Sequence, residues 1–188
     1  MGLTLASKIT IARILAAPFF IAAVLSYTPE KDYLRFVALY IFLFAAVSDL
    51  LDGFVARHFQ QHSKAGAVLD PLADKILLMS AFVCLYAMGN AFTGFHFPIW
   101  FIVILISRDV ILMVGTVVEY VIRGDLDIVP SGWGKSTAFL ESLCIVGFLL
   151  QLPLSRWLWP AVFVAACVSL FQYVYRGMKL LPPYGGKK

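Results

Sequence analysis

The chain has 188 residues, of which 61% are hydrophobic and 14% are charged. A soluble domain usually carries charge on about a quarter of its residues, so this composition excludes an ordinary soluble protein and predicts one that lies in a membrane. The formal net charge of +4 is too small and too dispersed along the chain to indicate a nucleic-acid-binding protein.

Six apolar stretches follow one another, separated by short polar joints. A spanning helix needs roughly 20 apolar residues, and lipid leaves the backbone no alternative to a helix except a closed barrel. These runs do not alternate as barrel strands do. We therefore predict an all-α, polytopic membrane protein with six transmembrane helices, forming a single domain over residues 1–188. The predicted spans are residues 9–27, 34–51, 67–88, 97–118, 136–152 and 157–175.

Six spans put both chain ends on one side of the membrane, together with the polar joints near residues 52–66 and 119–135. Most Lys and Arg residues of the joints and tails fall on that side, and only Lys31, Arg35 and Arg156 fall on the other. The positive-inside rule makes the first side cytoplasmic. We expect any site built there to face the cytoplasm.

Four aspartates flank the joint between the second and third spans. Asp49 and Asp52 are three residues apart and Asp70 and Asp74 are four apart, so each pair lies on one helix face. A hairpin of these helices brings four carboxylates together, and their repulsion at the membrane edge needs neutralisation. Two divalent cations supply it, and carboxylate oxygens suit Mg²⁺, Mn²⁺ or Ca²⁺ rather than Zn²⁺. A two-metal site suits an in-line displacement at phosphorus.

An alternative interpretation is that the aspartates cap helices and pair with Arg57, Lys64 and Lys75 at the membrane interface. Four acids on adjacent helix ends favour the metal site over this alternative. Gly53 and Gly66 fit a ligand site, because a residue without a side chain lets a ligand approach the backbone closely. By themselves they are equally typical of loops.

The segment resembles the signature D-x2-D-G-x2-A-R-x8-G-x3-D-x3-D of the CDP-alcohol phosphatidyltransferases. Residues 5–18 and 70–75 are also similar to segments of the bacterial members, so the resemblance covers most of the chain. It implies an integral protein of a bacterial cytoplasmic membrane and a homodimer. All fixed positions of the signature match: Asp49, Asp52, Gly53, Ala56, Arg57, Gly66, Asp70 and Asp74.

The resemblance implies transfer of a phosphatidyl group from CDP-diacylglycerol to an alcohol acceptor, with release of CMP. Asp49, Asp52 and Asp70 would hold one divalent cation, and Asp49, Asp70 and Asp74 a second, with Mg²⁺ expected and Mn²⁺ as the other choice. Asp74 would also be the general base for the acceptor hydroxyl.

The resemblance also implies a binding site for the cytidine diphosphate part of the donor. Its lining would be Gly53, Ala56, Arg57 and Gly66, with Arg57 facing the phosphate charge.

Arg108 and Asp109 interrupt the fourth apolar run about halfway along, where charge is expensive and usually functional. One interpretation is an ion pair that holds helices in register. The other is that Arg108 binds an anionic acceptor, since a basic residue on this helix is implicated in acceptor binding in the family. Gly134 and Lys135 resemble a G-K segment of the members that use glycerol 3-phosphate, which puts Lys135 in the acceptor site too. The alternative for Lys135 is an interfacial anchor.

The acceptor is the least determined part of this interpretation. Members that use glycerol 3-phosphate typically have Glu where this chain has Asp109, and a second arginine where it has Thr116. Members that form cardiolipin also show an R-D pair. We expect glycerol 3-phosphate, with phosphatidylglycerol as the alternative acceptor. A small carrier that couples cations or protons through the aspartates is a third hypothesis, which the spacing of Arg57 and the glycines argues against.

Overall fold

The computed structural model of the chain describes residues 5–59, 64–92, 96–123 and 132–180. Within these ranges every regular element is a helix, which confirms the all-α prediction. The elements are α1 (Leu5–Leu25), the 3₁₀ turn η1 (Pro29–Lys31), α2 (Tyr33–Phe59), α3 (Lys64–Phe92), α4 (Ile99–Arg123), α5 (Gly132–Leu149) and α6 (Ser155–Leu180).

Most helices are longer than the apolar spans predicted from the sequence. The largest difference lies at the joint predicted near residues 52–66, where α2 continues to Phe59 and α3 begins at Lys64. That joint is therefore mostly helical. An apolar window marks where a helix can contact lipid, whereas Ala, Arg, Leu and Lys favour helix in any surroundings. Both halves of the aspartate signature consequently lie on helices.

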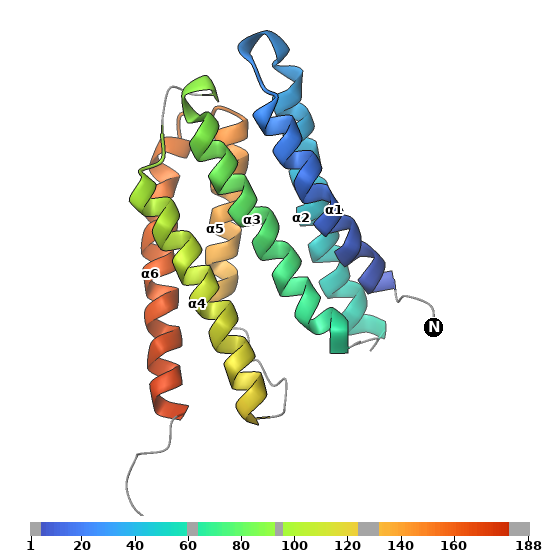
Figure 1. Cartoon of the computed structure of the whole chain (residues 1–188), viewed down its shortest axis with the longest axis vertical. Coiled ribbons are helices and arrows are strands. Elements are labelled where there is room, and N and C mark those ends of the chain that lie inside the picture. The colour runs from blue at the N-terminus through green and yellow to red at the C-terminus, as the bar shows by residue number, and fades with distance from the viewer. Residues whose placement is uncertain (1–4, 60–63, 93–95, 124–131, 181–188) are drawn as a thin grey trace, which may run out of the picture.

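The helices form a bundle in which α3 and α5 connect two sides (Figure 1). On one side α1 packs along both α2 and α3, and on the other α5 packs along α6. Smaller contacts join α3 to α4 and α5, α2 to α5, and α4 to α6. The start of α1, the end of α2, the start of α3 and the end of α6 all lie at the same end of the bundle (Figure 1). The segments that carry the four aspartates are thus together at that end.

Aromatic rings fill the core towards the opposite end. The ring centroids of Phe97 and Phe148 are 4.9 Å apart, which joins the start of α4 to α5. The rings of Phe82 on α3 and Phe101 on α4 meet edge to face at 5.9 Å, and Trp159 on α6 meets Phe101 at 5.5 Å. Tilted and edge-to-face pairs are the arrangements that aromatic rings prefer. This cluster fixes how α3, α4, α5 and α6 meet.

Large apolar side chains also cover the outside of the bundle. Such a surface is larger than a soluble monomer usually shows and is typical of helices in lipid. Side chains with between 67% and 77% of their area exposed include Phe19, Tyr40, Phe44, Phe139, Trp157 and Phe171.

Length and composition single out one candidate membrane span among the described residues, Trp157–Tyr175 within α6. Ala12–Leu25, Tyr33–Ser48 and Ser136–Leu149 are shorter apolar helices. The described residues thus form six α-helices, while six crossings of a membrane stay a prediction.

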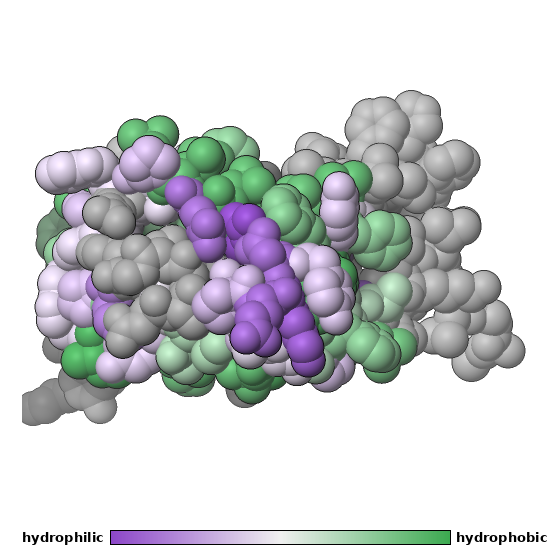
Figure 2. Space-filling model, turned by 90° about the horizontal axis from the view of Figure 1, so that it is seen from above, coloured by the Kyte–Doolittle hydropathy of each residue, from purple (hydrophilic) through white to green (hydrophobic). Residues whose placement is uncertain are grey.

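Arg35 clamps the end of the bundle opposite the aspartates. Its Nε and Nη2 donate to the Asp32 carboxylate at 2.9 and 2.8 Å, and its Nη1 donates to the carbonyl of Leu149 at 3.1 Å. Leu149 is the last residue of α5, where carbonyls lack partners within the helix. The hydrogen bonds from Arg35 also lower the pKa of the Asp32 carboxyl. Seen from this end, hydrophilic residues form a band with hydrophobic residues around it (Figure 2).

Replacing Arg35 should weaken the bundle without changing its fold. Arg35→Met removes a charge-assisted hydrogen bond to the Leu149 carbonyl, a kind worth about 1.5 to 3 kcal/mol. We expect the unfolding temperature of the protein in detergent to fall by roughly 5 °C. The control is Lys31→Met, which removes a cation from an exposed position nearby. This variant should leave the unfolding temperature unchanged. Equal unfolding temperatures for the two variants would contradict the clamp.

Candidate functional site

The four aspartates lie on two helices that end and begin at the same end of the bundle. Asp49 and Asp52 are on α2, and Asp70 and Asp74 are on α3. Because each helix is continuous through its pair, the spacings of three and four residues keep both members on one face. Asp74 is partly buried, whereas the side chains of the other three lie outside the described part of the chain. The metal site therefore stays a prediction.

The described side chains do not form a metal site by themselves. Among them, no group of three or more His, Cys, Asp or Glu residues is close enough to hold an ion. Asp74 is one of these described side chains, whereas its three predicted co-ligands are not. The predicted metal centre is therefore still untested.

The other residues predicted to bind substrates also lie on helices. Gly53, Ala56 and Arg57 are on α2, Gly66 is in the first turn of α3, and Lys135 is in the first turn of α5. Their side-chain positions are outside the described part of the chain, so their predicted roles stay predictions.

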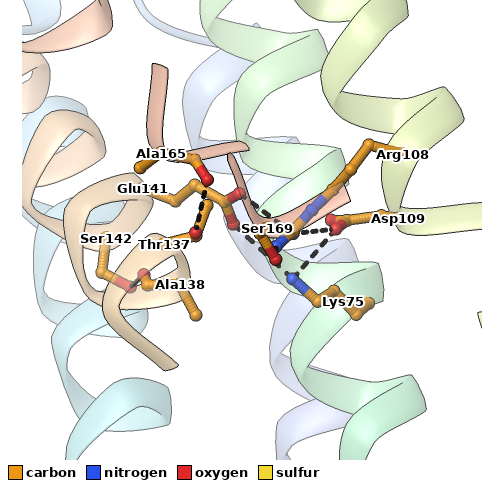
Figure 3. A network of polar contacts seen from close by, with 9 residues as sticks. All are labelled: Lys75, Arg108, Asp109, Thr137, Ala138, Glu141, Ser142, Ala165 and Ser169. Carbon is orange, nitrogen blue, oxygen red and sulfur yellow. Dashed lines mark hydrogen bonds and ion pairs between the residues drawn. The ribbon is translucent and has the colours of Figure 1, made fainter. Parts of the chain in front are cut away.

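A buried polar cluster joins four helices about halfway along the bundle (Figure 3). The Lys75 ammonium on α3 lies 3.1 Å from Asp109 on α4 and 3.7 Å from Glu141 on α5. The Arg108 guanidinium on α4 donates through Nη1 to Asp109 and through Nη2 to Ser169 on α6, at 2.7 Å for the latter. Its Nη1 also lies 3.6 Å from Glu141. We call these five residues the ionic cluster.

The ionic cluster is almost completely shielded from solvent. The side chains of Arg108, Asp109 and Glu141 expose 1%, 4% and 2% of their areas, and that of Lys75 exposes 17%. Two cations face two acids, so the cluster is neutral. Burying a single charge costs several kcal/mol, and a buried charge persists only when it is paired. Removing one of its four charged members therefore leaves an uncompensated charge between the helices.

Glu141 is held by charge more than by hydrogen bonds. Neither of its carboxylate oxygens accepts a hydrogen bond from the described residues, although Lys75 and Arg108 lie within 4 Å. A narrow cavity beside Glu141 and Asp109 is otherwise lined by apolar side chains: Leu78, Met79, Phe82, Leu105 and Ile106. Both acids thus line a cavity between α3, α4 and α5 whose other walls are apolar.

Two further contacts hold α6 against its neighbours close to the cluster. Thr137, one turn before Glu141 on α5, donates to the carbonyl of Ala165 at 3.3 Å. On α4, Gly115 has no side chain, and the Tyr173 ring of α6 occupies the space that a Cβ would need. The cluster therefore lies in a tightly packed part of the bundle.

The sequence left two interpretations of Arg108 open, an ion pair with Asp109 and the binding of an anionic acceptor. The predicted ion pair between Arg108 and Asp109 is present, and it extends to Lys75, Glu141 and Ser169. The proposed binding of an acceptor by Arg108 is not tested by these contacts. Glu141 is not among the residues predicted from the sequence, although a carboxylate inside an apolar run is the same signal that indicates Asp109.

Comparisons with known proteins agree with the signature. The sequence profile of the CDP-alcohol phosphatidyltransferase family matches residues 3–172. A probable phosphatidylglycerophosphate synthase of Mycobacterium tuberculosis is 31% identical over 175 residues, which cover 93% of this chain and 78% of that protein. The CDP-diacylglycerol–glycerol-3-phosphate 3-phosphatidyltransferase of Sodalis glossinidius is 33% identical over 186 residues, covering 93% and 95%. A cardiolipin synthase (CMP-forming) / mitochondrial hydrolase fusion protein of Schizosaccharomyces pombe is 37% identical over 110 residues, 58% of this chain and 16% of that protein.

Proposed function

This chain belongs to the CDP-alcohol phosphatidyltransferase family, and from that premise we propose that it transfers the phosphatidyl group of CDP-diacylglycerol to glycerol 3-phosphate. The observation that carries the proposal is the family match over residues 3–172, which contains the whole aspartate signature. Four of the relatives named for glycerol 3-phosphate align with more than nine-tenths of the chain. A relative named as a cardiolipin synthase / mitochondrial hydrolase fusion protein aligns with 58% of the chain. Phosphatidylglycerol is therefore the second candidate acceptor.

The donor set supports two bound divalent cations, with Mg²⁺ as the expected metal. Asp49, Asp52 and Asp70 would hold one cation, and Asp49, Asp70 and Asp74 the other. These are hard oxygen ligands on adjacent ends of two continuous helices, α2 and α3, which is the chemistry that Mg²⁺ prefers. When bound, such a pair of cations stabilises the attacking and leaving oxygens of a displacement at phosphorus.

The chain's own residues then divide the remaining work. Asp74 accepts the proton of the acceptor hydroxyl while the hydroxyl oxygen attacks the phosphorus that carries diacylglycerol. The bond from this phosphorus to the oxygen of CMP breaks, and CMP leaves with that oxygen. Arg57 pairs with the phosphate charge of the donor, and Arg108 and Lys135 bind the phosphate of the acceptor.

Close backbone approach shapes the donor site on the same two helices. Gly53, Ala56 and Gly66 carry no side chain beyond a methyl group, so the cytidine diphosphate can lie against α2 and α3.

The proposed setting is a bacterial cytoplasmic membrane crossed six times. The exposed apolar side chains along the helices support it, since lipid is the solvent that such a surface suits. The excess of Lys and Arg at the aspartate end supports a cytoplasmic site. A homodimer is proposed from the family resemblance alone.

The test of the function is CMP release by the purified protein. We expect Mg²⁺-dependent CMP release from CDP-diacylglycerol when glycerol 3-phosphate is supplied, with phosphatidylglycerophosphate as the lipid product. A panel that includes phosphatidylglycerol separates the two acceptors. If no acceptor gives metal-dependent CMP release, the transferase is excluded and the carrier hypothesis becomes the better one.

Asp70 offers the sharpest test of the metal assignment. Asp70→Asn removes a ligand proposed for both cations and should abolish CMP release while the protein stays folded in detergent. Asp32→Asn makes the same change at the opposite end of the bundle and should keep full activity. Turnover above roughly a tenth of wild type at saturating Mg²⁺ would contradict the assignment.

Arg108→Lys tests the proposed acceptor site. Lysine keeps the charge but loses the planar, two-pronged hydrogen bonding of a guanidinium. Since a charge-assisted hydrogen bond is worth about 1.5 to 3 kcal/mol, the KM for glycerol 3-phosphate should rise roughly tenfold to a hundredfold, with the KM for CDP-diacylglycerol unchanged.

Thermal stability alone cannot decide this test, because Arg108 also binds Asp109 and Ser169. Arg35→Lys, at another buried arginine far from the site, provides the control for lost stability. An acceptor KM that stays at the wild-type value in both variants would remove Arg108 from the acceptor site.

A further inference from the structure

Lys75 is adjacent to Asp74, the proposed general base, but its charge is paired with acids from two other helices. It follows Asp74 directly on α3, and its ammonium lies 3.1 Å from Asp109 and 3.7 Å from Glu141. Figure 3 shows the lysine side chain directed towards these two acids. The acids that compensate Lys75 therefore come from α4 and α5.

The ionic cluster begins one residue after Asp74 on α3. Asp74 directly precedes Lys75 on α3, and the Lys75 ammonium contacts both acids of the cluster. Water screens little between groups this buried, so a unit of charge gained or lost in the cluster acts strongly on nearby ions. With Lys75 and Arg108 against Asp109 and Glu141, the cluster adds no net charge beside Asp74.

We propose that Asp109 and Glu141 are positioning residues for the transfer reaction. They hold the Lys75 ammonium on the side of α4 and α5, and they keep its charge from acting against a cation bound by Asp74. Lysine is a flexible point charge, so without these acids its ammonium would turn towards other anions nearby. The inference rests on the proposed function, because it requires Asp74 to bind a divalent cation.

Two variants that preserve shape test the role of charge. Asp109→Asn and Glu141→Gln each remove one negative charge and leave the cluster with a net charge of about +1. Mn²⁺ is the probe, and its binding to the purified protein is measured from the electron paramagnetic resonance signal of the free ion. We expect the Kd for Mn²⁺ to rise about tenfold in either variant. We expect kcat to fall by a similar factor. Asp109→Glu keeps the charge and should bind Mn²⁺ as the wild type does.

A double variant that restores neutrality distinguishes this electrostatic role from a purely structural contact between helices. Adding Lys75→Met to Asp109→Asn makes the cluster neutral again, with Arg108 facing Glu141. The Kd for Mn²⁺ should then return most of the way to the wild-type value, although another contact between helices has been lost. A double variant that binds Mn²⁺ no better than Asp109→Asn would overturn the proposal.

The failure of this inference differs from the failure of the proposed function. If the wild type binds Mn²⁺ and releases CMP, and both single variants bind Mn²⁺ as tightly, only the positioning role is overturned. If the wild type neither binds Mn²⁺ nor releases CMP, the proposed function falls and the inference with it. Arg35→Met, which loosens the far end of the bundle, shows how much of any change comes from lost stability.

Discussion

The buried charges of the ionic cluster are the constraint on which the rest of the bundle depends. Lys75, Arg108, Asp109 and Glu141 come from three helices, and Ser169 adds a fourth. Each charge is stable between the helices only while its partners are in place. The cluster therefore fixes α3 against α4, α5 and α6. Since α1 packs along both α2 and α3, the position of the aspartate pairs follows from that of α3.

The two ends of the bundle are held by different means. At one end the Arg35 guanidinium ties the start of α2 to the last carbonyl of α5, and aromatic rings fill the core behind it. At the other end α2 and α3 carry the four aspartates, for which we propose two divalent cations as partners. If the proposed cations bind there, one end of the bundle is closed by its own side chains and the other is completed by ligands, as an enzyme with a single substrate entrance would require.

The sequence predicted what depends on local spacing and missed what depends on which helices are neighbours. Asp49 and Asp52 lie on one helix, as do Asp70 and Asp74, because periods of three and four residues belong to any helix. The end of α2 at Phe59 was not predicted, because hydropathy does not report where a polar helix stops. Glu141 and Ser169 could not be assigned to Arg108 from the sequence, because more than 30 residues separate each of them from it.

A structure of the protein with Mn²⁺ and CDP-diacylglycerol, recorded where manganese scatters anomalously, tests the central claim most directly. We expect anomalous peaks between α2 and α3 at roughly 2 Å from the aspartate oxygens, with the Lys75 ammonium still on Asp109 and Glu141. Donor bound with no manganese beside Asp74 would contradict the metal site. Manganese in place with Lys75 turned onto Asp74 would contradict the role given to the ionic cluster.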